Sequence, residues 1–215
     1  MATTDRPSGI MHARAHESAG SPVLIHLASR SPRRRLLLEQ AGLPFRVIDA
    51  PIDDSELDPG DCDPVSWVMS LAHLKARAGF QARPPESGVV LGADTVCVAG
   101  RSAIGKPASA PEARAMIRSF VGRTHDVVTG VCLIGRHATD RQVFAVRARV
   151  SLGELPEDRI ESYIESGEWA DKAGGYNYFD RRDDGWPLTC TGDETAVVGL
   201  PMRELTRRLA AIRSP

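Results

Sequence analysis

The chain of 215 residues is poor in aromatic residues and lacks the short motifs that mark several large enzyme classes. Phe, Trp and Tyr make up 5% of the residues, so we expect a core built mainly of Val, Leu, Ile and Ala. The sequence contains no GxGxxG or Walker motif, no HExxH motif and no Ser/His/Asp spacing typical of a triad. These absences argue against Rossmann-type, P-loop and zinc-protease chemistry.

The four cysteines give no sign of a zinc site. Cys62, Cys97, Cys132 and Cys190 form no CxxC pair. Cys97 and Cys132 lie inside apolar runs, which predicts that they are small buried residues. We therefore expect reduced thiols and a cytoplasmic protein.

Charge and hydropathy exclude two kinds of partner. With 27 basic and 28 acidic residues the net charge is -1, which argues against a general nucleic-acid-binding protein. No apolar run approaches the ~20 residues that would span a bilayer, so we expect no membrane partner. Residues 1–22 are polar, aperiodic and without an apolar h-region. This pattern predicts a disordered leader over 1–22, followed by one domain over 23–215.

Strand and helix patterns alternate along the chain, which predicts an α/β fold with a mixed sheet. Ser31-Pro32 is typical of a helix start and Gly42 of its end. Strands are expected over 23–28, 45–52, 89–98, 127–134, 144–152 and 196–199, and further helices over 63–80, 110–121, 156–166 and 201–212.

The segment 28–35, Ala-Ser-Arg-Ser-Pro-Arg-Arg-Arg, is the first candidate site. It joins a buried strand to a helix N-terminus, where free backbone N–H groups and the helix dipole favour an anion. Ser29, Arg33 and Arg34 add donors suited to phosphate oxygens. Arginines in a first turn oppose the dipole, and a bound anion would relieve that cost. The alternative is a solvated basic turn.

Two ionisable residues stand where apolar residues are expected. Lys75 shares a helical stripe with Val68, Leu71 and Ala78, so it must extend to solvent, pair with a carboxylate or meet a ligand. Asp94 lies in the middle of a strand that is predicted to be buried on both faces. A buried carboxylate needs a cation or a metal, so we interpret Asp94 as a metal ligand or general base. The alternative is a structural Asp paired with Lys106.

Three weaker signals complete the residues that could carry chemistry. Gly105-Lys106-Pro107 is a turn that would display a cation. Asp53, Asp54 and Glu56 form an acidic loop that offers oxygen ligands to a hard cation, although such loops are often only polar. His125 lies between a helix end and a strand, where a hydrogen bond within a turn is the expected role.

Together these segments resemble the Maf family of nucleoside triphosphate pyrophosphatases, also described as septum formation inhibitors. The resemblance covers residues 23–212, and its specificity comes from eight short motifs in the right order. The motifs are Ser29-Arg30-Ser31-Pro32-Arg33-Arg34, Leu74-Lys75-Ala76, Gly92-Ala93-Asp94-Thr95-Val96, Gly105-Lys106-Pro107, Gly122-Arg123-Thr124-His125-Asp126-Val127, Thr129-Gly130, Asp171-Lys172-Ala173-Gly174-Gly175-Tyr176 and Val197-Val198-Gly199-Leu200-Pro201.

The resemblance implies an elongated α/β fold with two lobes around a cleft, a homodimer and a requirement for Mg²⁺ or Mn²⁺. The activity it implies is hydrolysis of a nucleoside triphosphate to the monophosphate and pyrophosphate. By the same resemblance, the substrate-binding residues are Ser29, Arg33, Arg34 and Lys172, the catalytic residues are Asp94, Lys75 and Lys106, and the metal ligands are Asp94 with Asp53 or Asp54.

Within the family, the sequence resembles the branch that acts on dTTP, UTP and related pyrimidine nucleotides. The paired Arg33 and Arg34, Asp94-Thr95 and the Asp-Lys pair at 171–172 carry this assignment. One position departs from the family, because Phe179 stands where a glutamine is usual. Alternatives are a nucleotide-binding regulator of cell division without catalysis, a pyrophosphatase for ITP or XTP, and a 7-methyl-GTP pyrophosphatase.

Overall fold

The computed structural model describes residues 22–49, 52, 57, 60–100 and 102–212. The predicted leader, except for Pro22, lies outside the described residues, and so does the acidic run from Asp53 to Glu56. The described elements are, in order, β1 (Ile25–Leu27), α1 (Pro32–Gln40), β2 (Phe45–Val47), α2 (Pro64–Ala82), β3 (Val89–Ala99), β4 (Ser102–Ile104), α3 (Ala110–Phe120), β5 (Arg123–Ile134), β6 (Arg141–Leu152), α4 (Glu157–Ser166), η1 (Ala173–Gly175), α5 (Tyr178–Asp183), β7 (Leu188–Thr191), α6 (Glu194–Val198) and α7 (Met202–Ala211).

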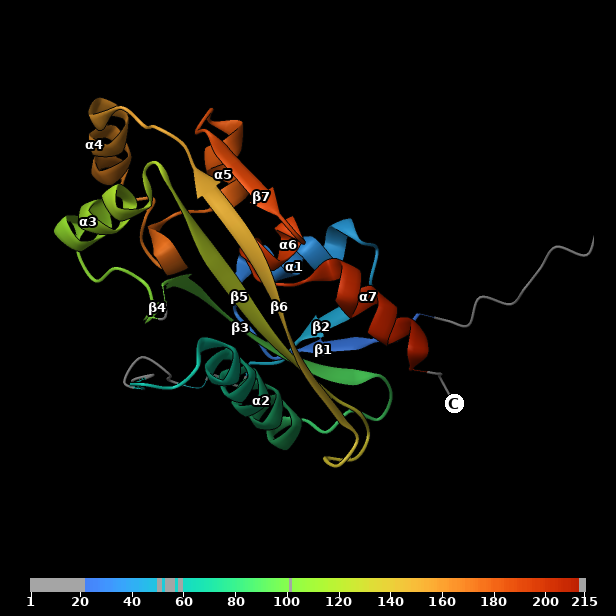
Figure 1. Cartoon of the computed structure of the whole chain (residues 1–215). Helices are drawn as coiled ribbons and strands as arrows, with labels where there is room; N and C mark the ends of the chain where they lie inside the picture. The colour runs from blue at the N-terminus through green and yellow to red at the C-terminus, as the bar shows by residue number, and fades with distance from the viewer. Residues whose placement is uncertain (1–21, 50–51, 53–56, 58–59, 101, 213–215) are drawn as a thin grey trace, which may run out of the picture.

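One mixed sheet organises these elements. Its strand order is β2-β1-β3-β5-β6-β7, with β4 also paired to β3. β1 is parallel to both β2 and β3, whereas the pairs from β3 through β5 and β6 to β7 are antiparallel. Helices flank the sheet (Figure 1). The predicted α/β class with a mixed sheet is therefore confirmed.

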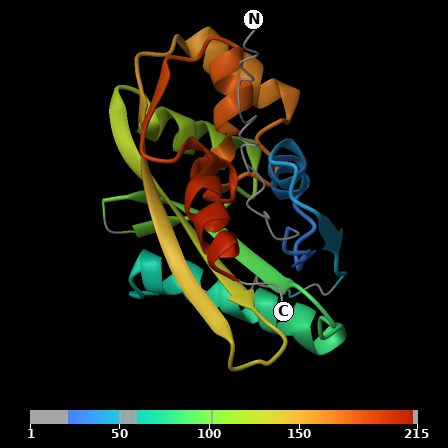
Figure 2. The same ribbon diagram turned by 90° about the vertical axis from the view of Figure 1, so that its right-hand side faces the viewer.

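The two faces of the sheet are covered very differently. Helix α2 packs on one face, across β3 and β5, and lies apart from the other helices (Figure 1, Figure 2). The approach is close: a Cβ placed on Gly92 would lie 2.4 Å from the Ala72 carbonyl oxygen, and one on Gly130 would lie 2.4 Å from the Val68 carbonyl oxygen. The opposite face carries the larger core, which includes side chains of α1, α3, α4 and α7.

Local sequence explains where most helices begin and end. Asp63 accepts a hydrogen bond from the Ser66 amide at 3.0 Å and caps α2, and Ser109 caps α3 by accepting from the Glu112 amide. Helix α1 begins at Pro32 as predicted, but the Ser31 hydroxyl makes no capping bond. Glycine with positive φ follows the last turn of α4, at Gly167.

Several elements differ from the sequence-based prediction. The strand predicted over 196–199 was wrong, because Glu194–Val198 forms the short helix α6, which Asp193 caps by accepting from the Thr195 amide at 3.0 Å. An apolar run of four residues fits a buried helical turn as well as a strand. The short elements β4, η1, α5 and β7 were not predicted, and β5 begins at Arg123 rather than Val127.

Within the residues that the structure describes, no helix combines the length and apolar character needed to cross a membrane.

The contact between α2 and β3 gives a first prediction. Gly92→Ala places a methyl group against the backbone of Ala72 and Ala76, which side-chain rotation cannot relieve. We expect the free energy of unfolding to fall by about 1–3 kcal/mol, measured by urea denaturation. Gly105→Ala is the control, because its Cβ would meet no atom within 4 Å. Equal stability of the two variants would contradict the packing described.

Candidate functional site

The candidate site lies along an interruption in the pairing of β3. Strand β1 pairs with Val89 to Leu91, and β4 pairs with Cys97 to Ala99 on the far part of the strand. Among the described residues, neither strand pairs with the stretch 92–96 between them, which contains Asp94 and Thr95. Because successive residues of a strand point to opposite faces, these two side chains leave the strand on opposite sides.

Asp94 points toward α2 and is paired with Lys75. The Lys75 ammonium Nζ donates to the Asp94 carboxylate Oδ1 at 2.6 Å, and the two side chains are only 18% and 12% exposed. The burial of β3 was predicted, and so was the position of Lys75 on an apolar stripe of its helix. The ion pair between Asp94 and Lys75 connects these two elements. Asp94 is not paired with Lys106, which was the alternative. A shielded ion pair of this kind is strongly affected by loss of either partner.

Thr95 points to the other face, where Arg34 is buried. Arg34 Nη2 donates to Thr95 Oγ1 at 3.4 Å, and Thr129 Oγ1 lies 2.8 Å from the same hydroxyl and donates to the Ala196 carbonyl at 2.7 Å. A hydroxyl carries one proton, so the bonds must run from Arg34 to Thr95, then to Thr129, then to Ala196. This chain ties α1, β3, β5 and α6 together beside Asp94.

Arg34 also fixes Ser29 and the end of α6. Its Nη1 donates to Ser29 Oγ at 3.0 Å, and its Nε donates to the Gly199 carbonyl at 3.0 Å. The Ser29 hydroxyl in turn accepts from the Ser31 amide at 3.2 Å. The first turn of α1 contains no acidic residue to offset the dipole. Ser29, Arg34 and the N-terminus of α1 thus form a positively charged region next to β3, which we call the Arg34–Ser29 corner.

A second group of cations lies around residue 171. Arg33 Nη2 donates to the Asp171 carbonyl at 3.5 Å, and Lys106 Nζ lies 3.9 Å from the Asp171 carboxylate. Lys172 donates to the Glu168 carbonyl, and burial together with the nearby Arg33 guanidinium lowers the pKa of Lys172. The structure therefore brings Arg33 and Lys106 to Asp171, with Lys172 close to Arg33, and the roles of these cations in binding and catalysis stay predictions.

The predicted metal position is only partly described. Asp53 and Asp54 lie outside the described residues, so the prediction that one of them meets the metal stays a prediction. Among the described residues, no group of three or more His, Cys, Asp or Glu side chains is arranged to hold a metal ion. Asp94 is a buried carboxylate of the sheet that pairs with Lys75 of α2.

His125 does not have the role in a turn that was expected. It lies in β5, is 3% exposed, stacks on Phe120 at 4.0 Å between ring centroids, and its Nε2 lies 2.7 Å from Tyr176 Oη. Its buried Nδ1 has no hydrogen-bond partner within the described part of the chain. Burial lowers the pKa of His125 from 6.5 to about 4, against a smaller opposing effect of Asp126.

The aromatic residues after Tyr176 belong to the core. Tyr178 is 2% exposed and Trp186 is 3% exposed. Phe179, which stands where the family glutamine is usual, is half-buried, packs edge-to-face on Tyr178 and lies under the Arg182 guanidinium at 5.0 Å. Tyr178 and Trp186 are therefore core residues, and Phe179 packs against the same core.

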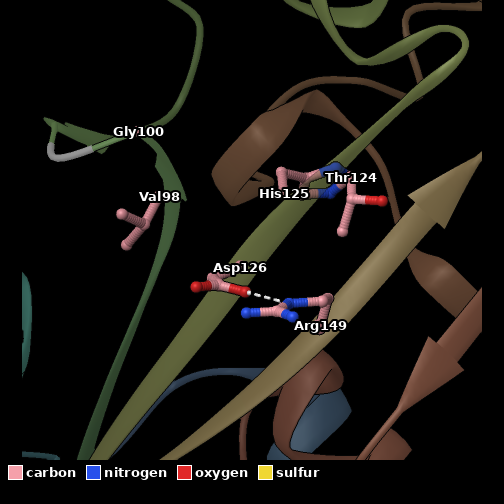
Figure 3. A pocket seen from close by; sticks show the side chains of 6 residues that line it. All are labelled: Val98, Gly100, Thr124, His125, Asp126 and Arg149. Carbon is pink, nitrogen blue, oxygen red and sulfur yellow. Dashed lines mark hydrogen bonds and ion pairs between the residues drawn. The ribbon is translucent and has the colours of Figure 1, made fainter.

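One cavity of the described structure is lined by residues other than the predicted site residues. Figure 3 shows its lining by Val98, Gly100, Thr124, His125, Asp126 and Arg149, and its volume is about 340 Å³. Asp126 accepts from Arg147 at 2.9 Å and from Arg149 at 3.3 Å, so its charge is balanced within the sheet. Of the predicted site residues that the structure describes, none lines this cavity.

Comparison with known proteins places the chain in a family. The model of the family described as Maf-like protein matches residues 24–212. The chain belongs to the Maf family. The dTTP/UTP pyrophosphatase of a Bacillus cereus strain is similar to it, with 40% identity over 185 residues, which are 86% of this chain and 93% of that protein. The dTTP/UTP pyrophosphatase of Nitratidesulfovibrio vulgaris is 39% identical over 194 residues, which are 89% of this chain and 88% of that protein.

In this Maf domain, sequence reasoning missed the residues that hold the predicted site residues in place. The Gly199 carbonyl, the Thr129 hydroxyl and the Asp171 carbonyl all act through hydrogen bonds over long sequence separations. Thr129-Gly130 and the segment 197–201 were recognised as motifs. No local pattern indicated that Gly199 accepts from Arg34, or that Thr129 bonds to Thr95, which accepts from the same arginine.

The contacts of Arg34 predict that lysine cannot replace it. A lysine ammonium cannot reach three acceptors in the directions that the guanidinium uses, so buried acceptors would lose partners. We expect Arg34→Lys to lower the free energy of unfolding by about 2 kcal/mol. Arg33→Lys, at the adjacent and less buried position, should change it by about 0.5 kcal/mol or less. Denaturant unfolding of both variants tests this, and equal losses would contradict it.

Acid stability gives a prediction for His125. Between pH 6.5 and about 4 the unfolded chain protonates this imidazole and the folded chain does not. The stability from neutral His125 is therefore complete above pH 6.5 and is lost as the pH falls toward 4. Over that range the wild type should lose about 3 kcal/mol more than His125→Gln. The measurement is urea unfolding at a series of pH values, and parallel pH curves would contradict it.

Proposed function

We propose that this Maf domain hydrolyses pyrimidine nucleoside triphosphates such as dTTP and UTP to the monophosphate and pyrophosphate. The names of relatives that are about 40% identical over most of the chain support the activity. The observation that carries the proposal is the Lys75–Asp94 pair at the interrupted part of β3, with the Arg34–Ser29 corner beside it.

The arrangement of cations supports a polyanionic substrate. Ser29 and the start of α1 offer donors on one side, and Arg33, Lys106 and Lys172 gather on another. A triphosphate in Mg²⁺-containing solution carries several negative charges, and phosphoryl transfer depends mainly on positioning and charge stabilisation. We assign Ser29, Arg33, Arg34 and Lys172 to substrate binding. Lys75 and Lys106 would stabilise charge that develops during cleavage.

The donor chemistry fits a divalent metal of the hard type. Mg²⁺ is usually held by one or two carboxylates together with phosphate oxygens and water, so a large cluster of protein ligands is not required. Asp94 would hold the ion, and Asp53 or Asp54 remains the predicted second ligand. When bound, such an ion would neutralise phosphate charge and lower the pKa of an attacking water. Mn²⁺ has similar ligand preferences.

Asp94 is the proposed general base. Its carboxylate is held from one side by Lys75, and burial in β3 leaves it little freedom to rotate. We infer that it accepts a proton from the water that attacks the α-phosphate, while Lys75 keeps it oriented. Bond cleavage then releases pyrophosphate, and we assign to Lys106 the compensation of charge on the leaving group.

The substrate is tested by measuring pyrophosphate release from a panel of dTTP, UTP, CTP, ITP, XTP and 7-methyl-GTP with Mg²⁺ or Mn²⁺. Preference for dTTP and UTP supports the proposal. Preference for ITP and XTP or for 7-methyl-GTP would assign the chain to another branch, and tight binding without turnover would indicate a regulator.

The homodimer and the cytoplasmic location remain predictions. Sedimentation at several protein concentrations tests whether the chain forms a homodimer.

Replacement of the proposed base should strongly reduce turnover, and the melting temperature of the variant shows whether the chain stays folded when Lys75 loses its charged partner. Asp94→Asn keeps the shape of the side chain and removes the charge, so we expect kcat for dTTP to fall by about 10²–10⁴-fold. Asp126→Asn is the matched control, because Asp126 lies on the same face of the adjacent strand β5 and pairs with Arg147 and Arg149 instead of a predicted site residue. The control should retain most of its kcat. Normal turnover by Asp94→Asn would remove Asp94 from the mechanism.

A further inference from the structure

Asp171 has an unusual backbone conformation. Its φ is 57°, and among the described residues it is the non-glycine residue with positive φ. Asp tolerates this left-handed region better than most residues, but the conformation still costs free energy. Packing of its own side chain does not explain the cost, because that side chain is 93% exposed.

The conformation lets one residue contact two cations from different parts of the fold. The Asp171 carbonyl accepts from Arg33 of α1 at 3.5 Å, while its carboxylate lies 3.9 Å from Lys106 in the segment between β4 and α3. A backbone bond of 3.0 Å from the Gly174 amide to the Gly105 carbonyl holds the same two segments together. Asp171 therefore lies where α1, the Lys106 turn and η1 converge.

The ion pair itself contributes little to folding. Lys106 is 62% exposed and Asp171 93% exposed, and pairs in such surroundings are weakened by water and salt. A weak pair can be exchanged easily for a better partner. A phosphate group that approaches Lys106 offers more negative charge than one carboxylate. The lysine ammonium can therefore change its partner from Asp171 to the phosphate while staying in the same position.

We propose that Asp171 is a positioning residue, which holds Lys106 through its carboxylate and Arg33 through its strained carbonyl before the triphosphate arrives. The inference rests on the proposed function and deepens it, because it names how the two cations are kept in place. Such preorganisation lowers the cost of arranging charge during the reaction.

The two contacts predict different kinetic effects. Loss of the carboxylate leaves Lys106 less ordered, so kcat should fall. The same change removes a negative charge beside a polyanion, so KM should stay the same or decrease. A smaller folded fraction would also lower the apparent kcat at constant KM, so melting temperatures and the dependence of the effect on Lys106 distinguish positioning from a general structural role.

The experiment compares three substitutions at this position in steady-state pyrophosphate release. Asp171→Asn and Asp171→Gly both tolerate positive φ but lack the carboxylate. Asp171→Ala lacks the carboxylate and also disfavours that φ. Asp140→Asn, in the hairpin between β5 and β6, is the control for loss of one negative charge at an exposed position. Melting temperatures show whether each variant is folded.

We expect Asp171→Asn and Asp171→Gly to lower kcat on the order of tenfold with no rise in KM. Asp171→Ala should in addition raise KM, because the carbonyl no longer faces Arg33, and Asp140→Asn should match the wild type. In a Lys106→Ala background, Asp171→Asn should change kcat by less than about twofold, because its effect acts through that lysine.

A normal kcat in Asp171→Asn, or an effect that persists in full without Lys106, would overturn the inference while leaving the proposed function intact. A wild-type chain that releases no pyrophosphate from any nucleotide of the panel would overturn both. If Asp171→Ala fails to fold, the Asn and Gly variants still decide the role of the carboxylate.

Discussion

A carboxylate in the interior of a sheet must be compensated, and this requirement organises the candidate site. Asp94 lies in a strand buried on both faces, and the Lys75 ammonium compensates it at 2.6 Å from the facing helix. The pair depends on the close approach of α2, which glycine at position 92 permits. Shape and charge are thus linked, because a bulkier residue at position 92 would move the lysine away from the acid.

The second constraint is the interruption of β3. Strand β1 is short and β4 pairs only with the far part of β3, so the middle of this strand is left accessible to side chains of α1. Arg34 reaches into that region and connects Ser29, Thr95 and Gly199. The proposed triphosphate site would therefore use both faces of this strand, with Asp94 on one side and the Arg34–Ser29 corner on the other.

Asp171 contacts cations from two separate segments. Its carbonyl accepts from Arg33 of α1, and its carboxylate lies 3.9 Å from Lys106, while its backbone has a positive φ. Flexible lysines and arginines in water lose considerable entropy when they are ordered around a ligand. Contacts that order them in advance reduce that loss, which is the physical reason to expect strain to be retained here.

Local sequence patterns were enough to predict the α/β class, the approximate starts of α1, α2 and α3, and the burial of Cys97 and Cys132. These features follow from local patterns of charge, apolar spacing and capping. Tertiary structure alone decided that Asp94 pairs with Lys75 rather than Lys106, that 194–198 is helical, and that His125 is buried against Phe120. Each of these depends on contacts between residues distant in sequence or on burial of a short segment, which local spacing does not encode.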